Sequence, residues 1–280
     1  MDTILLNNKT QIPMQAFGVR GLTDPDICEQ VCLYSIKSGF RNIDTSPLYH
    51  NEKSIGIVIS ECSVPRQELY ISSKVYPRNY KKGVERSIEK TLKNLRTDYL
   101  DLLLIQTPLC GDWKNAWRAM ERAVDEKIVR SIGVCNFITR HIIDELVNIA
   151  NIPPCVDQVE CHPFLQQNRL REKLNMENIR LEAWYPLGHG KSLLLNNPVL
   201  LDIATAHHTT SAQVILRWHL QMGNIAIVGS SNPDHIRRNL HLESFTLSPE
   251  DIELISSLDI GRNLYRMPKP LQQFGYSFAR

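Results

Sequence analysis

The sequence predicts an α/β fold, a (β/α)8 TIM barrel preceded by an N-terminal β-hairpin. Short runs rich in aliphatic and β-branched residues alternate with longer amphipathic stretches along the 280-residue chain. Eight such runs occur within about 250 residues, which is the strand count of a closed barrel. An open doubly wound sheet is the alternative, but the chain has no Gly-x-Gly-x-x-Gly turn and no Pro/Ser/Gly-rich linker. We therefore expect one domain over residues 1–280.

The strands are expected from apolar runs and from the turns between them. Thr3–Leu6 and Thr10–Pro13 flank the polar turn Asn7–Lys9, which predicts the hairpin. Several later runs are almost wholly apolar, as in Leu-Asp-Leu-Leu-Leu-Ile at 100–105, and this is typical of strands buried on both faces. The barrel strands are expected at 14–18, 39–44, 69–73, 99–106, 129–135, 156–160, 179–185 and 225–229.

The segments between the strands have helical periodicity. Between 84 and 95, apolar residues recur every three or four positions while Lys and Glu fill the other face. Gly39 is expected to end the first helix, and Ser248-Pro249-Glu250-Asp251 supplies a cap, a first-turn proline and acids for the last. Helices are expected at 26–38, 84–95, 113–124, 138–149, 199–206, 211–220 and 248–258, and another is expected to begin after Tyr49.

Composition and charge disfavour several classes of protein. Hydrophobic residues make up 42% and charged residues 22%, which is typical of a globular chain. Lys and Arg total 32 against 30 Asp and Glu, so no electrostatic feature points to nucleic acid or a membrane surface. No apolar run reaches the roughly 18 residues of a membrane-spanning helix, and the N-terminus does not resemble a signal peptide. We expect a cytoplasmic monomer.

The cysteines and histidines do not form a recognisable metal motif. Seven cysteines are an odd number without the spacing of a disulfide framework, which fits a reducing compartment. Cys161-His162 and His207-His208 lack a second pair at zinc-site spacing. We expect no metal.

Three chemically distinct side chains are expected to meet at one end of the barrel. Chemistry in such barrels lies at the carboxyl ends of the strands. Asp44 and Lys74 follow neighbouring strands, and Tyr49 lies five residues after Asp44. An ammonium held by a carboxylate stabilises a phenolate, so we expect it to lower the pKa of the tyrosine. Taken singly, each residue could equally be a cap, a rim charge or a core side chain.

Several segments resemble the aldo-keto reductase family, and their sequences are most similar to those of its bacterial and fungal diketogluconate-reductase-type members. The segment 40–52 reads Phe-Arg-Asn-Ile-Asp-Thr-Ser-Pro-Leu-Tyr-His-Asn-Glu and resembles the family's signature. Ile71–Lys74, Arg130–Phe137, Asp157–Pro163, Ala183–Gly188 and Ile227–Asn239 are similar to further family segments in the same order. The resemblance covers nearly the whole chain.

The resemblance implies an NADP(H)-dependent reductase that transfers a hydride to the carbonyl carbon of a small molecule. By position, Tyr49 would be the general acid, Lys74 would tune it and Asp44 would orient Lys74. Asn136 and Gln158 would bind the nicotinamide carboxamide, and Trp184 would stack on its ring. The implied cofactor residues are Cys135, Asn136, Gln158, Trp184, Tyr185, Leu187, Gly229, Ser230, Ser231, Asn232, His235, Arg238 and Asn239, and the implied substrate residues are Arg20, Tyr76 and Thr107.

The sequence departs from the family at the fourth catalytic position. The family has histidine where this chain has Gln106, which can donate a hydrogen bond but cannot titrate. Two alternatives to carbonyl reduction therefore stay open. One is a family member that binds the cofactor with little turnover, and the other is a reductase of activated C=C bonds.

Further departures bear on cofactor choice and substrate polarity. Gly229 and His235 stand where the family usually has lysine and arginine, but Arg238 lies in the same segment and no acid is present to bind the 2′-hydroxyl of NAD. We expect NADPH to be preferred over NADH by a reduced margin. Arg20 and Thr107 favour an acidic rather than a flat apolar substrate, unless Arg20 faces solvent or pairs with a neighbouring acid.

Overall fold

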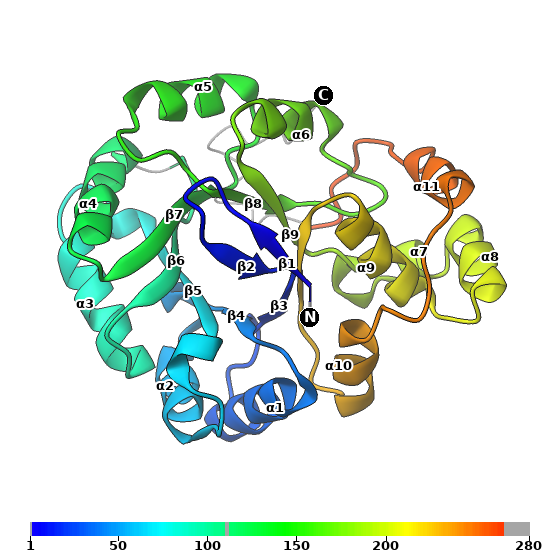
Figure 1. The fold of residues 1–280 in the computed structure, drawn as a ribbon, viewed down its shortest axis with the longest axis horizontal. Coiled ribbons are helices and arrows are strands. Elements are labelled where there is room, and N and C mark those ends of the chain that lie inside the picture. The colour runs from blue at the N-terminus through cyan, green and yellow to red at the C-terminus, as the bar shows by residue number, and fades with distance from the viewer. Residues whose placement is uncertain (1, 110–111, 266–280) are drawn as a thin grey trace.

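Eight parallel strands close into a barrel, as predicted from the sequence (Figure 1). The computed structural model describes residues 2–109 and 112–265. The last strand pairs with both the first and the seventh, and these contacts close the ring. The strands are β3 (Gln15–Gly18), β4 (Asn42–Asp44), β5 (Tyr70–Val75), β6 (Leu100–Ile105), β7 (Val129–Cys135), β8 (Val156–Glu160), β9 (Arg180–Trp184) and β10 (Ile225–Val228).

Helices surround the barrel on its outside (Figure 1). The predicted range 84–95 is confirmed without change as α3, and the other predicted ranges shift by one or two residues at their ends. The helices are α1 (Pro25–Ser38), α2 (Glu52–Glu61), α3 (Val84–Leu95), α4 (Trp113–Asp125), α5 (Arg140–Ile149), α6 (Asn168–Met176), α7 (Ser192–Leu195), α8 (Pro198–Ala206), α9 (Ser211–Gln221), α10 (Pro233–Leu240) and α11 (Pro249–Ser256), with 3₁₀ turns η1 (Pro47–Tyr49), η2 (Arg66–Glu68), η3 (Pro77–Asn79) and η4 (Gly188–Gly190).

Three helices were absent from the predicted ranges: α6, α10 and the four-residue α7. The apolar buried side chains of α6 are Leu170 and Leu174, and those of α10 are Ile236 and Leu240. A single i, i+4 pair is too short a repeat to establish helical periodicity in a sequence. Helices α6 and α10 were therefore missed because few apolar side chains suffice to anchor them to the barrel.

The second barrel strand begins later than predicted. Gly39 has φ of 118°, and its backbone N–H donates to the carbonyl of Ile36, so it ends α1. This left-handed conformation is easily adopted by glycine and is not strand backbone. The strand β4 therefore starts at Asn42 and not at Gly39.

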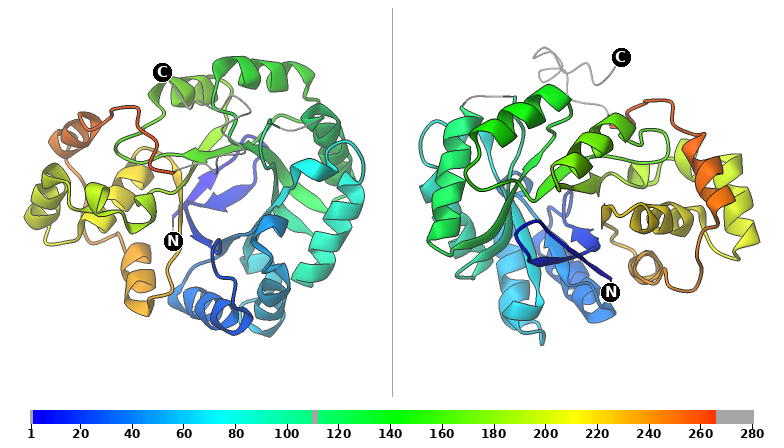
Figure 2. Two further views of the ribbon diagram at one scale, coloured as in Figure 1. Left: turned by 180° about the vertical axis from the view of Figure 1, so that it is seen from behind. Right: turned by 45° about the horizontal axis from the view of Figure 1, so that its top comes forward.

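The N-terminal hairpin lies across one end of the barrel (Figures 1 and 2). It consists of β1 (Thr3–Leu5) and β2 (Gln11–Pro13), paired antiparallel. In its turn, Asn8 Nδ2 donates to the carbonyl of Arg130 at 3.1 Å and to Ser131 Oγ at 3.0 Å. These residues lie at the start of β7, so the hairpin covers the amino-terminal ends of the strands. The carboxyl ends, where the predicted site residues lie, are at the opposite end.

The apolar core has an outer and an inner part. Outward-facing strand residues such as Ile43, Ile71 and Ile132 pack with helix residues such as Trp117 and Trp218, all of which are buried. A smaller cluster joins the hairpin residues Leu6 and Ile12 to strand residues inside the barrel. These two layers hold the strands in fixed register and so give the strand ends fixed relative positions.

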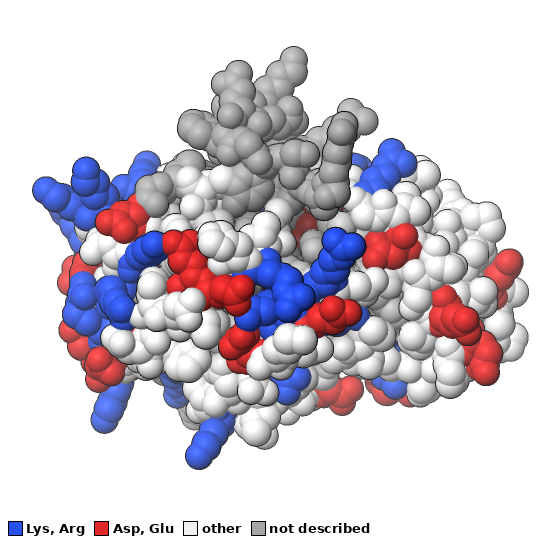
Figure 3. Space-filling view, turned by 90° about the horizontal axis from the view of Figure 1, so that it is seen from above, with Lys and Arg blue, Asp and Glu red and all other residues white. Residues whose placement is uncertain are grey.

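Charges of both signs are interspersed over the face shown in Figure 3. The whole chain carries a formal net charge of +2. Within residues 2–109 and 112–265, no helix is both long and apolar enough to span a membrane.

Candidate active site

Asp44 and Lys74 form a buried ion pair inside the barrel. Asp44 is the last residue of β4, and Lys74 lies within the neighbouring strand β5. Lys74 Nζ donates to Asp44 Oδ1 at 2.5 Å and to the carbonyl of Thr45 at 3.1 Å. Burial, the largest single effect, disfavours the ammonium, but the charge and hydrogen bond of Asp44 together with Tyr49 and Cys135 outweigh it and raise the pKa of Lys74. Lys74 is therefore a cation held in place by a carboxylate, as expected.

Tyr49 lies beside this ion pair at the end of η1. Lys74 Nζ is 5.4 Å from the centre of the Tyr49 ring, and no hydrogen bond joins Nζ to the Tyr49 hydroxyl in the part of the chain that the structure describes. Burial raises the pKa of Tyr49 to about 12, while the charge of Lys74 acts to lower it. The expectation of a net lowered pKa is therefore wrong, because the desolvation of the phenol exceeds the effect of the ammonium.

Gln106 follows β6 and is fixed by a neighbour of Tyr49. Its Oε1 accepts a hydrogen bond from Ser46 Oγ at 3.0 Å, and Ser46 also caps η1. The Gln106 carbonyl accepts from Asn136 Nδ2 at 3.2 Å. With Oε1 engaged, the Nε2 amide hydrogens have no acceptor among the described residues. The group that replaces the expected histidine is thus a neutral donor.

Asn136 and Trp184 form one hydrogen-bonded unit on the adjoining side of the mouth. Trp184 Nε1 donates to Asn136 Oδ1 at 3.1 Å. Asn136 has φ of 65°, a left-handed conformation that asparagine tolerates better than most residues, and its Nδ2 also lies 3.2 Å from Cys135 Sγ. The half-buried indole is therefore held in a defined orientation, as a stacking surface requires.

Gln158 is bonded toward the barrel interior, where a residue that the sequence analysis missed contacts it. Its Nε2 donates to Asp44 Oδ1 at 3.0 Å and to Glu182 Oε2 at 2.9 Å. Glu182 is fully buried, and its Oε1 has no hydrogen-bond partner among the described residues. Burial, followed by the charge of Asp44, raises the pKa of Glu182 to about 7. An acid inside a predicted buried strand is the sequence signal that could have identified it.

Arg20 contacts a tyrosine from the far end of the chain. Arg20 Nη2 donates to Tyr265 Oη at 2.7 Å, and the guanidinium lies 4.9 Å from the centre of that ring. The Tyr265 ring also packs edge-on against Trp184, at 5.4 Å between centroids. Arg20 is therefore an exposed residue near the mouth whose guanidinium is hydrogen-bonded to a phenol and forms no salt bridge with an acid among the described residues.

A second buried carboxylate that the sequence analysis missed fixes this C-terminal segment. Glu160, at the end of β8, accepts hydrogen bonds from the backbone N–H of Leu264 at 2.7 Å and of Tyr265 at 2.8 Å. It also accepts from Asn263 Nδ2 at 2.7 Å. Three donors from consecutive residues thus converge on one carboxylate, which determines where Tyr265 lies.

The other two expected substrate residues lie on the side of the mouth formed by β5 and β6. Thr107 directly follows Gln106, and its backbone N–H and carbonyl both bond the Tyr80 hydroxyl, at 3.1 and 3.0 Å. Tyr76 is half-buried and lines a cavity that extends away from the mouth between α2 and α3.

The expected adenosine-binding residues gather around the start of α10. Asn232 caps this helix, accepting from the Asp234 N–H at 2.9 Å, and the side chains of His235 and Arg238 are exposed. Asn239 faces inward and is buried. Tyr185 and Leu187 are half-buried beyond β9, where Tyr185 stacks on His189 at 5.8 Å between ring centroids. The remaining expected residues of this segment are Gly229, Ser230 and Ser231.

Metal-ligating side chains are not assembled at this mouth. Across residues 2–109 and 112–265, no group of three or more His, Cys, Asp and Glu side chains is placed to hold a metal ion.

Comparison with known proteins places these features in one family. A profile described as "Aldo/keto reductase family" matches residues 14–260. The chain is 41% identical over 261 residues to a glyoxal reductase of Bacillus subtilis, covering 92% of this chain and 93% of that protein. It is 36% identical over 262 residues to a 9,11-endoperoxide prostaglandin H2 reductase of Trypanosoma cruzi, covering 92% of each.

Solved structures agree with this placement. An aldo-keto reductase from a deep-sea metagenome library superposes with a TM-score of 0.90 at 33% identity, covering 94% of this chain and 97% of the other. An aldo/keto reductase from Brucella melitensis superposes with a TM-score of 0.88 at 34% identity, covering 92% and 99%. The chain belongs to the aldo/keto reductase family of oxidoreductases.

Proposed function

We propose that the protein reduces an aldehyde or ketone to an alcohol with NADPH, using Tyr49 as the proton donor. The observation that carries this proposal is the buried Asp44–Lys74 ion pair beside Tyr49. Family membership supports a nicotinamide-dependent oxidoreductase. The choice of NADPH and the roles of individual residues rest on the side chains themselves.

The residues at the mouth fit a nicotinamide nucleotide. Trp184 presents a half-buried aromatic surface whose orientation is fixed by Asn136. Gln158 has its amide nitrogen held by two carboxyl groups, so its Oε1, which accepts a 3.6 Å hydrogen bond from the Cys135 thiol, is the atom that would accept a further bond from a carboxamide. Near α10, the serine hydroxyls and the exposed Arg238 guanidinium are suited to phosphate oxygens. We propose that NADPH is preferred over NADH by a small margin, because one guanidinium replaces the usual pair of cations.

Proton donation follows from the environment of Tyr49. The bound nicotinamide would supply the hydride. Because burial keeps the pKa of Tyr49 at about 12, its hydroxyl is protonated at neutral pH and available as a donor. As the proton leaves Oη for the substrate oxygen, the Lys74 ammonium stabilises the developing phenolate, and Asp44 keeps that ammonium in place. Gln106 Nε2 donates to the same substrate oxygen and aligns it.

Gln106 also favours the two alternatives. A neutral amide aligns a carbonyl less strongly than an imidazole that can become charged, so slow turnover or reduction of an activated C=C bond would each fit a glutamine here. These alternatives predict different substrate ranges.

A cofactor-oxidation assay separates the three functions. The wild-type protein is assayed over small aldehydes, ketones, enones and keto acids with NADPH and then NADH, beside a direct titration of each cofactor. We expect turnover of aldehydes or keto acids and a modestly higher kcat/KM with NADPH. Tight cofactor binding without turnover of any class would indicate a binding protein, activity on enones alone would indicate C=C reduction, and equal or better efficiency with NADH would overturn the cofactor assignment.

A further inference from the structure

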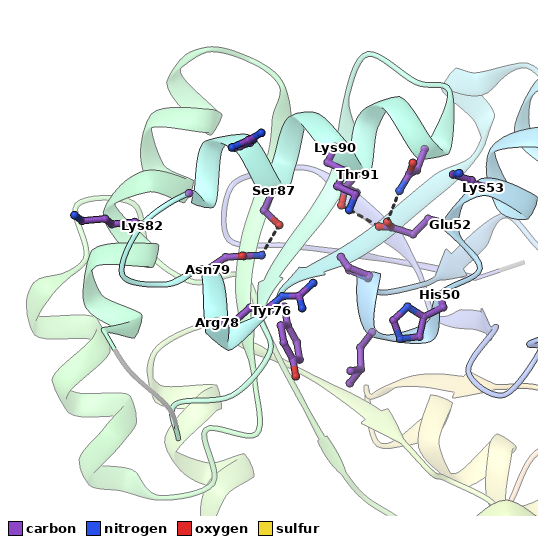
Figure 4. Close-up of a pocket in the computed structure, with 15 residues that line it drawn as sticks. His50, Glu52, Lys53, Tyr76, Arg78, Asn79, Lys82, Ser87, Lys90 and Thr91 are labelled. Atoms are coloured by element: carbon purple, nitrogen blue, oxygen red, sulfur yellow. Dashed lines mark hydrogen bonds between the residues drawn. The ribbon is translucent and has the colours of Figure 1, made fainter.

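A cavity of about 880 Å³ opens between α2 and α3, beside the proposed active site (Figure 4). We call it the α2–α3 groove. Its lining includes Leu48 and His50, on either side of Tyr49 in the chain, but not Tyr49, Lys74 or Gln106. Its volume is in the range of small-molecule sites, about 300–1,000 Å³. The groove is therefore large enough for a ligand and separate from the proton donor.

The lining of the α2–α3 groove is strongly basic. It has five cationic side chains and a single carboxylate, Glu52, although the protein as a whole is almost electrically balanced. Figure 4 shows Lys82 at one end of the groove and Lys53 at the other. In the described chain, none of the five cations forms a salt bridge. The cations are Lys53, Arg78, Lys82, Arg86 and Lys90.

The arrangement of charge on α3 does not serve the stability of the helix. Within α3, Arg86 and Lys90 lie four residues apart, and like charges at this spacing in a helix repel by about 0.2–0.5 kcal/mol. Lys82 lies four residues before Arg86, just ahead of the helix. Of the two acids in this helix, Glu85 forms an ion pair with Arg122 of α4 at 2.5 Å, and Glu89 forms no salt bridge among the described residues. Basic side chains are therefore concentrated toward the groove at some cost to the helix.

The carboxylate in the groove is already used by the fold. Glu52 is buried, and its Oε1 accepts from Thr91 Oγ1 at 2.9 Å while its Oε2 accepts from Asn94 Nδ2 at 3.1 Å. These bonds join α2 to α3. The carboxylate thus offsets one positive charge and leaves the others without an anionic partner among the described residues.

The end of the groove nearest the barrel mouth is apolar. Pro47 and Tyr76 are half-buried there, and Leu48 is 44% exposed. An exposed leucine next to a half-buried aromatic ring offers a surface for the carbon skeleton of a ligand. One groove thus has a cationic wall and an apolar end.

We propose that the α2–α3 groove binds a small organic anion carrying a phosphoryl group. The phosphoryl group would lie among the basic side chains, where Arg78 and Arg86 can each donate two hydrogen bonds to its oxygens. The carbon portion would lie against Leu48 and Tyr76. A dianion is favoured over a carboxylate because the groove holds several uncompensated positive charges. The site is distinct from the proposed cofactor site near α10.

Calorimetric titration of the full-length protein with phenyl phosphate at low ionic strength tests this proposal, and inorganic phosphate is a second ligand. We expect saturable binding of one equivalent, weakened by about tenfold or more in Arg86→Gln/Lys90→Gln. Lys37→Gln/Lys93→Gln makes the same change in net charge away from the groove and should bind as the wild type does. Arg238→Gln, in the proposed cofactor segment, should also bind normally.

The results of these titrations decide whether the α2–α3 groove binds a phosphoryl group and whether it also binds the attached carbon skeleton. Tighter binding of phenyl phosphate than of inorganic phosphate supports an organic ligand, and equal binding contradicts the role proposed for Leu48 and Tyr76. The proposal is overturned if binding does not saturate, if the Lys37/Lys93 control weakens it equally, or if Arg238→Gln abolishes it while Arg86→Gln/Lys90→Gln does not.

Discussion

Gln106 differs from the family's histidine in charge and in how it is held. Its Oε1 is bound by Ser46 Oγ at 3.0 Å, so its donor amide is directed by a residue of the same loop that carries Tyr49. An amide can align a carbonyl oxygen but gives a weaker, uncharged hydrogen bond. We therefore propose that this residue limits how fast a simple carbonyl is reduced.

Replacing Gln106 by histidine tests that interpretation. We expect Gln106→His to raise kcat on small aldehydes at least about threefold, with little change in the Kd for NADPH, because alignment of an oxyanion is typically worth factors of ten to a thousand. Steady-state kinetics and a cofactor titration on the same preparation provide the measurement. A lower kcat would show that glutamine is matched to another substrate or reaction.

We propose that Arg20 recognises the charge of the substrate. Its guanidinium contacts the Tyr265 hydroxyl at 2.7 Å, and a phenol leaves the positive charge uncompensated. We expect Arg20→Ala to raise KM about tenfold for aldehydes that carry a carboxylate and to leave KM for a neutral aldehyde of similar size unchanged. An unchanged KM for the acidic substrate would exclude this role.

The protonation of Glu182 makes the free energy of unfolding depend on pH. In the unfolded chain its carboxyl group ionises near 4.5, whereas burial raises its pKa in the folded protein to about 7. Between these values the folded protein retains a proton that the unfolded chain has released, so the free energy of unfolding falls as pH rises. The loss is complete above pH 7 and is on the order of 3 kcal/mol.

Glu182→Gln should remove this pH dependence. We expect the free energy of unfolding of the variant, relative to that of the wild type, to increase by about 3 kcal/mol between pH 4.5 and pH 8, which means that the variant becomes relatively more stable. Urea unfolding at both pH values measures it, with the exposed Glu172→Gln as the control. If the difference between variant and wild type does not change with pH, Glu182 does not retain a proton in the folded state.

At the scale of elements, strand ends determine which side chains meet. Asp44 and Lys74 were expected to converge because their strands are neighbours in a parallel barrel, and they do. Glu160 and Tyr265 could not be paired from the sequence, since 105 residues separate them and the segment after α11 has no periodicity. The pKa of Tyr49 was misjudged because desolvation depends on packing that a sequence does not specify.

The Glu160 contacts predict the local stability of the C-terminal segment. In Glu160→Gln, an amide N–H₂ replaces one acceptor oxygen, and the charge that strengthens the other bonds is lost. We expect the Leu264 and Tyr265 amides to exchange with solvent about tenfold faster, as measured by hydrogen–deuterium exchange. The exposed Glu172→Gln should leave their exchange unchanged. Unaltered protection in Glu160→Gln would mean that other contacts hold the segment.

At the scale of the whole molecule, the N-terminal hairpin and the proposed active site lie at opposite ends of the barrel. The hairpin covers one end, where its Asn8 contacts β7, while the ion pair, Tyr49 and Gln106 lie at the other. Alternating apolar and amphipathic segments were enough to predict this architecture, because buried parallel strands need continuous apolar runs. Helices α6 and α10 were not predicted, because the barrel holds them through few apolar contacts.

The central claim is that Tyr49, placed beside the Asp44–Lys74 ion pair, donates the proton in carbonyl reduction. The most direct test compares Tyr49→Phe with the wild-type protein in NADPH-dependent reduction of a small aldehyde, together with the Kd for NADPH. Removing the only phenol at the proposed proton-donor position should lower kcat at least about a hundredfold and leave the Kd unchanged. A Tyr49→Phe variant that binds NADPH and reduces the aldehyde at the wild-type rate would contradict the claim.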